Sequence, residues 1–262
     1  MRHFLIDPDQ LDRARPSIIG PDVRHIRKVL RMKPGDPIRL SDGRGRIFDG
    51  RISGLSPQKV WVEILREEKP AESPAGPFIG VAQALLKDKK MDGLVRQLTE
   101  LGVVSWIPFV SDRSVPRPDE GRMEHRIERW RKIAREAVKQ CRRPAPPLIR
   151  EVLDWEGLFT EAANWDVRIL FWERSSTLLD SRSDPAGQKA PRLRILLILG
   201  PEGGFSDAEA DRANRRGWMS ASLGPRILRA ETAAVSACAL AQYLFGDMGP
   251  RPRSGIPEVG NQ

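Results

Sequence analysis

The chain after residue 77 alternates apolar runs with stretches of helical periodicity. Residues 193–199, Leu-Arg-Ile-Leu-Leu-Ile-Leu, are almost uninterruptedly apolar, a pattern typical of a strand that is covered on both faces. Shorter apolar runs predict further strands at 78–82, 106–110, 168–173 and 219–223. Helices are predicted over 91–101, 122–143 and 232–245. Because strands and helices alternate, this region is predicted to be an α/β domain built around a parallel sheet.

The predicted helix at 122–143 has two contrasting faces. Its apolar residues recur every three or four positions and therefore share one side: Met123, Ile127, Trp130, Ala134, Ala137 and Cys141. The opposite side is basic and carries Arg122, Arg126, Arg129, Arg135, Lys139 and Arg142. A basic face of this kind is either simply solvated or contacts a polyanion, and the segment itself leaves both interpretations open.

The first part of the chain is divided into short apolar runs by turn sequences. The turns are rich in glycine, proline, aspartate and serine and fall at 33–36, 41–45, 49–50 and 53–57. Strands are predicted between them at 38–40, 46–48, 51–52 and 59–65. Both faces of the last strand carry apolar residues, such as Val62 and Leu65, so both are expected to be partly buried. The pattern favours a small β-barrel.

A change of composition separates the two regions. Residues 67–77 combine charge, three prolines and small residues, which is typical of an exposed linker that joins a sheet poorly. We therefore predict an N-terminal domain at 1–70, a linker at 71–77 and a second domain at 78–247. The Pro- and Gly-rich residues 248–262 are expected to form a mobile tail.

The charge of the chain narrows the choice of partner. A formal net charge of +9 and a pI near 10.0 favour a polyanion, because lysines and arginines that neutralise phosphates release counterions on binding. Nucleic acid is the first candidate and an anionic membrane is the second.

Several classes of protein fit the sequence poorly. The two cysteines and three histidines show neither metal-ligand spacing nor a disulfide framework, so no metal site is expected. The N-terminal apolar run is too short for a signal peptide, and no stretch approaches the roughly 18 apolar residues of a membrane span. A cytoplasmic protein is therefore expected. The phosphate-loop and dinucleotide-binding fingerprints are also absent from the sequence.

Two glycine-containing loops are the strongest candidates for a ligand site. Gly200-Pro-Glu-Gly-Gly204 follows the strand at 193–199, and Ser206-Asp-Ala-Glu209 then has the pattern of a helix capping box. A glycine turn between a strand and a helix presents backbone N–H groups to a ligand, since no Cβ blocks the approach. Taken alone, a loop of this kind is more often a structural turn than a ligand-binding loop. The second loop, Leu223–Arg229, also stands between a strand and a helix and favours a pocket with two walls.

The order and spacing of a set of motifs resemble one known family. The motifs are Arg2-His-Phe4, His25-Ile-Arg-Lys-Val-Leu-Arg-Met-Lys-Pro-Gly-Asp36, Lys87-Asp-Lys-Lys-Met-Asp92, Glu100-Leu-Gly102, Pro108, Arg113, Glu136-Ala-Val-Lys-Gln-Cys-Arg-Arg143, Gly200-Pro-Glu-Gly-Gly204 and Leu223-Gly-Pro-Arg-Ile-Leu-Arg-Ala-Glu-Thr-Ala233. Over nearly the whole chain they resemble the RsmE family of small-subunit ribosomal RNA uridine-N3 methyltransferases, within the SPOUT superfamily. One departure is Arg142, which stands where a glycine is frequent in the family.

The resemblance implies a fold and a cofactor. The implied fold is α/β, with an N-terminal PUA-like β-barrel and a C-terminal SPOUT domain that contains a trefoil knot, and the implied oligomer is a homodimer. S-adenosylmethionine (SAM) would bind in the knot loops, with no metal ion. The residues that the resemblance assigns to the cofactor are Glu173, Leu199, Gly200, Pro201, Glu202, Gly203, Gly204, Leu223, Gly224, Ile227, Leu228 and Arg229.

Methylation of uracil at N3 makes a specific chemical demand, because N3 must lose its proton before or during attack on the methyl group. An arginine near the base would stabilise the developing anion, and Arg229 is the candidate catalytic residue. Glu202 or Glu231 would be able to assist deprotonation, but a structural role is favoured for both carboxylates. The general base is left unassigned.

RNA binding is assigned to basic residues of the same motifs: Arg2, His25, Arg27, Lys28, Arg31, Arg113, Arg142 and Arg143. Phosphate contacts of this kind position RNA without reading its sequence. The expected partner is small-subunit (16S) ribosomal RNA or the assembled small subunit. Two other functions stay open, namely methylation of another RNA position and a non-catalytic RNA-binding role in ribosome assembly.

Overall fold

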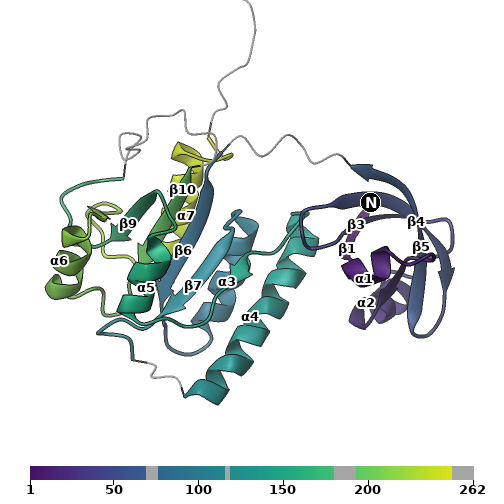
Figure 1. Cartoon of the computed structure of the whole chain (residues 1–262), viewed down its shortest axis with the longest axis horizontal. Helices are drawn as coiled ribbons and strands as arrows, with labels where there is room; N and C mark the ends of the chain where they lie inside the picture. Colours follow the sequence, from purple (N-terminus) through teal and green to yellow (C-terminus); the bar gives the residue numbers. More distant parts are fainter. Residues whose placement is uncertain (69–75, 116–118, 180–192, 250–262) are drawn as a thin grey trace, which may run out of the picture.

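A computed structural model of the chain describes residues 1–68, 76–115, 119–179 and 193–249. These residues form a five-stranded sheet near the N-terminus and, after it, a six-stranded sheet. The two parts lie side by side in Figure 1, with helix α4 (Glu120–Cys141) nearest to the N-terminal sheet. Lys139 of α4 connects them through an ion pair with Asp22, in which the nitrogen and oxygen are 2.8 Å apart.

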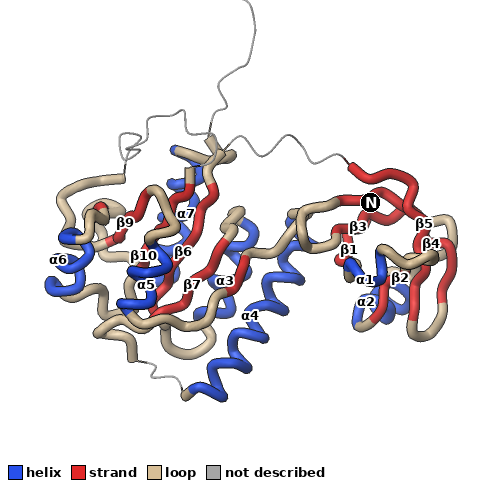
Figure 2. Tube along the Cα trace, in the orientation of Figure 1, coloured by secondary structure: helices blue, strands red, loops and turns tan. Residues whose placement is uncertain are grey.

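The N-terminal sheet is curled but open. Its strands are β1 (Arg2–Leu5), β2 (Ser17–Ile19), β3 (Pro37–Ser41), β4 (Ile47–Leu55) and β5 (Lys59–Glu68), and its helices are α1 (Pro8–Leu11), α2 (Pro21–Arg24) and the π-helical turn η1 (His25–Val29). The strand order β1-β3-β4-β5-β2 leaves β1 and β2 as edges, so the predicted barrel is a half-barrel. The helical segments complete its core with Leu11, Val23 and Ile26. Figure 2 shows these short helices beside the edge strands.

Two details of the predicted N-terminal strands are wrong. The predicted strands at 46–48 and 51–52 are parts of one strand, β4, which begins at Ile47 and in which the register shifts between Asp49 and Gly50. Gly50 is not a turn residue: a Cβ there would lie 2.5 Å from the Glu63 carbonyl oxygen of β5, so the close approach of the two strands requires a glycine. In β5 only one face is well buried, and Leu65 on the other face is 58% exposed.

The second sheet is parallel throughout, as predicted. Its strands are β6 (Phe78–Ala84), β7 (Ser105–Phe109), β8 (Leu148–Ile149), β9 (Val167–Phe171), β10 (Arg194–Leu199) and β11 (Met219–Ala221), in the order β11-β9-β10-β6-β7-β8. Strand β10 lies inside the sheet and is buried on both sides. Ile195, Leu197 and Leu199 enter one apolar cluster, whereas Leu196 and Ile198 enter the other. The continuous apolar run is explained by this position.

Helices cover both faces of the second sheet (Figure 1). The helices besides α4 are α3 (Lys90–Glu100), α5 (Trp155–Ala162), α6 (Asp207–Arg215) and α7 (Ala230–Leu244). Residues of α3, α4 and α7 pack into one cluster, and residues of α5 and α6 pack into the other. The apolar face predicted for α4 is buried at Met123, Ile127 and Trp130. The result is a three-layered α/β/α domain, as the alternation of elements predicts.

The residue that caps the C-terminus of α4 adopts an unusual backbone conformation. Arg142 caps the C-terminus of α4 with φ 61° and ψ 25°, in the left-handed region that a glycine commonly occupies at helix ends. For a non-glycine residue this conformation costs roughly 1–2 kcal/mol. The backbone therefore explains why a glycine is frequent at this position in the family that the motifs resemble.

Replacing Arg142 by glycine is expected to stabilise the fold. The relief of strain exceeds the roughly 0.5–1 kcal/mol that glycine loses through its freer unfolded chain, so the free energy of unfolding should rise by about 0.5–1 kcal/mol. Calorimetry should show a melting temperature higher by about 2 °C. Arg143→Gly is the contrasting variant, because Nη1 of Arg143 donates to the Thr99 and Val103 carbonyls at 2.7 and 2.9 Å, and it should destabilise the fold. A lower melting temperature for Arg142→Gly would contradict this account.

Parts of the predicted organisation stay predictions. Residues 71–75 of the linker and 250–262 of the tail lie outside the described residues, and the trefoil knot is still an implication of the resemblance. Among the helices that the structure describes, none is both long and apolar enough to cross a membrane.

Candidate functional site

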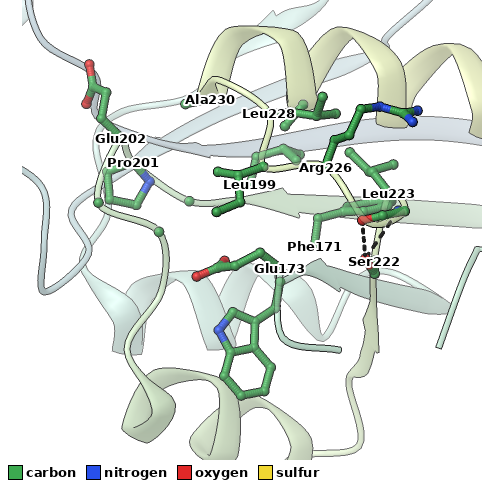
Figure 3. Close-up of a pocket in the computed structure, with 17 residues that line it drawn as sticks. Phe171, Glu173, Leu199, Pro201, Glu202, Ser222, Leu223, Arg226, Leu228 and Ala230 are labelled. Carbon is green, nitrogen blue, oxygen red and sulfur yellow. Dashed lines mark hydrogen bonds between the residues drawn. The ribbon is translucent and has the colours of Figure 1, made fainter. Parts of the chain in front are cut away.

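A cavity of about 260 Å³ opens where strands β9, β10 and β11 end. Three loops line it, at 172–173 after β9, 200–204 after β10 and 222–228 after β11, and the first turn of α7 lies behind them. Figure 3 shows these loops converging on one space. Ligands of parallel α/β sheets bind at the carboxyl ends of the strands, so this cavity is the candidate site.

Most residues predicted to bind a cofactor line this cavity. They are Glu173, Leu199, Gly200, Pro201, Glu202, Gly203, Gly204, Leu223, Gly224, Ile227 and Leu228. Arg229 is the exception: it is the exposed N-cap residue of α7 and is not among the lining residues. The lining residues that the sequence did not point to are Phe171, Trp172, Ser222, Arg226, Ala230 and Ala233. Of these, Arg226, Ala230 and Ala233 lie inside the motif at 223–233 and were identifiable from it, whereas Phe171 and Ser222 lie in no motif.

Gly204 shapes the wall of the cavity. Its φ of +65° is left-handed, and its N–H donates to the Pro201 carbonyl at 3.0 Å, which closes a tight turn. A Cβ at this position would lie 3.0 Å from an oxygen of Glu173, whose carboxylate projects into the space beside the loop in Figure 3. The turn and the carboxylate together therefore require a glycine here.

The loop at 200–205 is held from behind by distant parts of the chain. The Gln83 amide, which is 0% exposed, donates to the Gly200 carbonyl at 2.9 Å. The Glu202 carboxylate accepts from the Lys87 N–H at 3.1 Å and from the Lys90 ammonium at 2.9 Å. A loop that is already ordered costs a ligand little conformational entropy on binding, so the wall is preorganised.

The contacts of Glu202 assign it a structural role. Figure 3 shows its carboxylate directed away from Leu199 and Glu173. Partial burial alone would raise the pKa of this carboxyl, but hydrogen bonds from Lys90 and from backbone N–H groups outweigh burial and hold the pKa below its usual value. A carboxylate that is paired and remains ionised is a weak base. Glu231 lies on the same side, 3.7 Å from the Lys90 nitrogen.

A buried carboxylate fixes the far end of the same loop. Glu209 is fully buried and accepts from the Trp155 indole at 2.7 Å, the Asp112 N–H at 2.8 Å and the Ser206 N–H at 2.7 Å. The Glu209 N–H in turn donates to the Ser206 hydroxyl at 3.2 Å, so the predicted capping box is confirmed. The same carboxylate therefore starts α6 and ties it to the loop after β7.

Family comparisons agree with this architecture. A family model described as an RNA methyltransferase domain matches residues 73–242, and one described as an RNA methyltransferase PUA domain matches residues 18–65. Ribosomal RNA small subunit methyltransferase E of Bacillus subtilis is 32% identical over 92% of this chain and 96% of its own length. The chain belongs to the ribosomal RNA small subunit methyltransferase E family.

Solved structures of related proteins point to the cofactor of the family. The methyltransferase E of Neisseria gonorrhoeae, bound to SAM, is 29% identical and superposes with a TM-score of 0.80 over 95% of this chain and 99% of its own. A methyltransferase of Legionella pneumophila in complex with SAM is 27% identical, with a TM-score of 0.79 over 92% and 97% of the two chains. The cofactor of this chain is SAM.

The cavity fits this cofactor chemically. SAM carries an adenine edge and hydroxyl groups that hydrogen-bond to backbone, and also positively charged ammonium and sulfonium groups. The glycines of the 200–204 loop leave its backbone accessible, and Glu173 adds an anionic acceptor. Across the part of the chain that the structure describes, no cluster of three or more potential metal ligands is present.

The residues assigned to RNA fall into two groups. Those on α2–η1 and β1 are on the surface: Arg2, His25, Lys28 and Arg31 are exposed and Arg27 is half-buried. Arg142 is exposed at the end of α4. By contrast, Arg113 and Arg143 donate to backbone carbonyls of the protein itself. The first group is available to an external anion, and the second already has internal partners.

Proposed function

We propose that the protein transfers a methyl group from SAM to N3 of a uracil in small-subunit ribosomal RNA. The observation that carries the proposal is the three-loop cavity at the strand ends, in a chain that belongs to the methyltransferase E family. Calorimetric titration with SAM tests the enzymatic part. Binding that saturates at SAM concentrations below millimolar supports an enzyme. No binding at millimolar SAM would favour an RNA-binding assembly factor that has lost turnover.

In this proposal the protein acts mainly by positioning. SAM supplies the electrophilic methyl group when it is bound. Backbone groups of the loops at 200–204 and 222–228 hold the cofactor, and Glu173 accepts from its hydroxyl or ammonium groups. Fixing the donor and the base in one geometry removes much of the entropic barrier of a bimolecular transfer.

The proposed role of Arg229 is to stabilise the negative charge that develops on the uracil. Arg229 stands at the N-terminus of α7, directly after the loop that lines the cavity. Glu202 raises the pKa of nearby Lys90, and the positive charge of Arg229 opposes this rise. Cations and the N-terminus of a helix both favour an anion at this position. Because Glu202 is engaged by Lys90 and Lys87, the general base stays unassigned.

We propose that RNA docks on the α2–η1 turn rather than on the β4–β5 surface. None of the ion pairs between described residues includes Arg27 or Lys28 of the turn, or Arg31 just after it. On the β4–β5 surface, by contrast, Arg46 pairs with Glu67 and Arg51 pairs with Glu63, each at 2.8 Å. Carboxylates beside these arginines repel phosphate, so the unpaired cations offer the better surface for RNA.

Removing two unpaired cations should weaken RNA binding more than removing two paired ones. The double variant Lys28→Ala/Arg31→Ala should bind unmethylated small-subunit RNA about tenfold more weakly at physiological salt. The negative slope of log association constant against log salt concentration should become shallower by about 1–2. Arg46→Ala/Arg51→Ala loses the same net charge and is the matched control. Fluorescence anisotropy across a salt series measures both. Equal losses for the two double variants would refute this choice of surface.

We also propose that the protein is a cytoplasmic homodimer that uses α7 as its interface. Leu240 and Tyr243 lie three residues apart on α7 and are 42% and 54% exposed, and Ile227 of the cavity loop is 89% exposed. Large apolar side chains left exposed on one helix are typical of an interaction surface. Light scattering should give twice the chain mass of 29.5 kDa, and a single-chain mass would contradict the dimer.

A further inference from the structure

Arg113 belongs to a motif of the family but does not line the cavity. It lies on the loop after β7, and its Nη1 donates to the Gly203 carbonyl at 2.9 Å and to the Phe205 carbonyl at 3.4 Å. Gly203 lines the cavity, and its carbonyl is the atom that Arg113 holds. Arg113 therefore binds the backbone of the cavity loop from a neighbouring loop.

The two adjacent glycines of the loop have different partners. A Cβ on Gly204 would meet the Glu173 carboxylate inside the site, whereas a Cβ on Gly203 would lie 3.3 Å from Cβ and 3.5 Å from Cδ of Arg113. The missing side chain of Gly203 thus lets the aliphatic part of Arg113 lie against the loop. Gly203 does not have a positive φ, so this contact, and not backbone conformation, accounts for the glycine.

The loop that carries Arg113 is itself rigid. Ser111 and Ser114 are buried, their hydroxyl oxygens are 3.0 Å apart, and the Ser111 N–H donates to the Ser114 hydroxyl at 3.1 Å. The Asp112 N–H is bound by Glu209 at 2.8 Å. With the backbone fixed on both sides of Arg113, its guanidinium is presented to the Gly203 carbonyl at little entropic cost.

We propose that Arg113 is a positioning residue for SAM, and not an RNA contact, because it fixes the backbone of the cofactor loop at Gly203. The proposal rests on SAM binding in the described cavity. A hydrogen bond from a charged donor is stronger than one between neutral groups, and its loss lets the loop relax away from its binding geometry. Arg113 touches neither the cofactor nor the reacting atoms, so its effect is on cofactor affinity.

Calorimetry with SAM and anisotropy with unmethylated small-subunit RNA test the proposal. Arg113→Ala should raise the Kd for SAM about tenfold and leave the Kd for RNA unchanged, and Arg113→Lys should recover part of the loss. Kinetically, KM for SAM should rise while kcat at saturating SAM is largely kept. Arg174→Ala removes an exposed ion pair with Asp207 on the same side of the domain and should change neither Kd.

A double-mutant cycle separates this role from a general structural one. Gly203→Ala should also weaken SAM binding, because its methyl group displaces Arg113, and the double variant should bind no more weakly than Arg113→Ala. Additive losses would overturn the proposal, and so would a weaker RNA affinity with unchanged SAM affinity. SAM binding by the unmodified protein is measured in the same series, so failure of the proposed function is recognised separately.

Discussion

Gly204→Val is expected to raise the Kd for SAM at least about a hundredfold, equivalent to about 3 kcal/mol. Gly204 has a φ of +65°, and a Cβ would lie 3.0 Å from Glu173 within the cavity wall. A branched side chain would both occupy the cavity and push the carboxylate out of place. Calorimetry with SAM measures the effect, and circular dichroism checks that the variant is folded.

Gly217→Val is the matched control for this variant. Gly217 follows α6 with a similar left-handed φ of +77°, a Cβ added to it would meet nothing within 4 Å, and it does not line the cavity. A valine at Gly217 therefore has the same backbone strain as one at Gly204 but does not contact the site. If both valine variants lose the same amount of SAM affinity, backbone strain rather than contact with the cavity wall determines the loss. The assigned cofactor site would then be wrong.

Arg229→Ala is expected to lower kcat about 10²–10³-fold while the Kd for SAM stays within about twofold. The side chain is exposed at the start of α7 and lies outside the cavity lining, so cofactor contacts should survive its removal. The variant would lose only the stabilisation of the negative charge on the uracil, and this charge develops in the transition state. Single-turnover methylation with radiolabelled SAM measures the rate, and Arg229→Lys, which keeps the positive charge, should be partly active.

Arg226→Ala distinguishes the two arginines of this loop. Arg226 lines the cavity, three residues before Arg229, and its removal should mainly weaken SAM binding. A large loss of kcat in Arg226→Ala, together with unchanged turnover in Arg229→Ala, would move the catalytic role to Arg226.

Features that depend on local sequence could be predicted. The continuous apolar run of β10 follows from burial on two faces, and the capping box joins residues only three positions apart, Ser206 and Glu209. The position of the glycine loop between this strand and α6 follows from the same segments. Family motifs then identified most of the cavity lining, because the motifs are the loops themselves.

Features that depend on distant partners could not be predicted. The donors that hold the cavity loop are Gln83, Lys90 and Arg113, which are separated from their acceptors by 117, 112 and 90 positions. A periodic pattern describes which face of an element is buried but carries no information about such pairs. For the same reason the sequence assigns Arg113 to RNA, as a basic residue of a family motif, and gives no sign of its contact with Gly203.

Short elements were also missed, for a different physical reason. Helices α1 and α2 have four residues each, too few for a helical period to emerge, and they begin with prolines that resemble turn residues. The sequence predicts a small β-barrel from the strands that became β3, β4 and β5. The short edge strands β1 and β2 and the helical segments that complete the core of the half-barrel were not predicted.

The most direct test of the proposed function is nucleoside mass spectrometry of small-subunit ribosomal RNA methylated in vitro. Unmethylated RNA, or small subunits assembled from it, is incubated with the protein and SAM, and Arg229→Ala is the negative control. The proposal predicts 3-methyluridine at one site, formed only when both the protein and SAM are present. A different methylated nucleoside, or no methylation by a protein that binds both SAM and RNA, would contradict it.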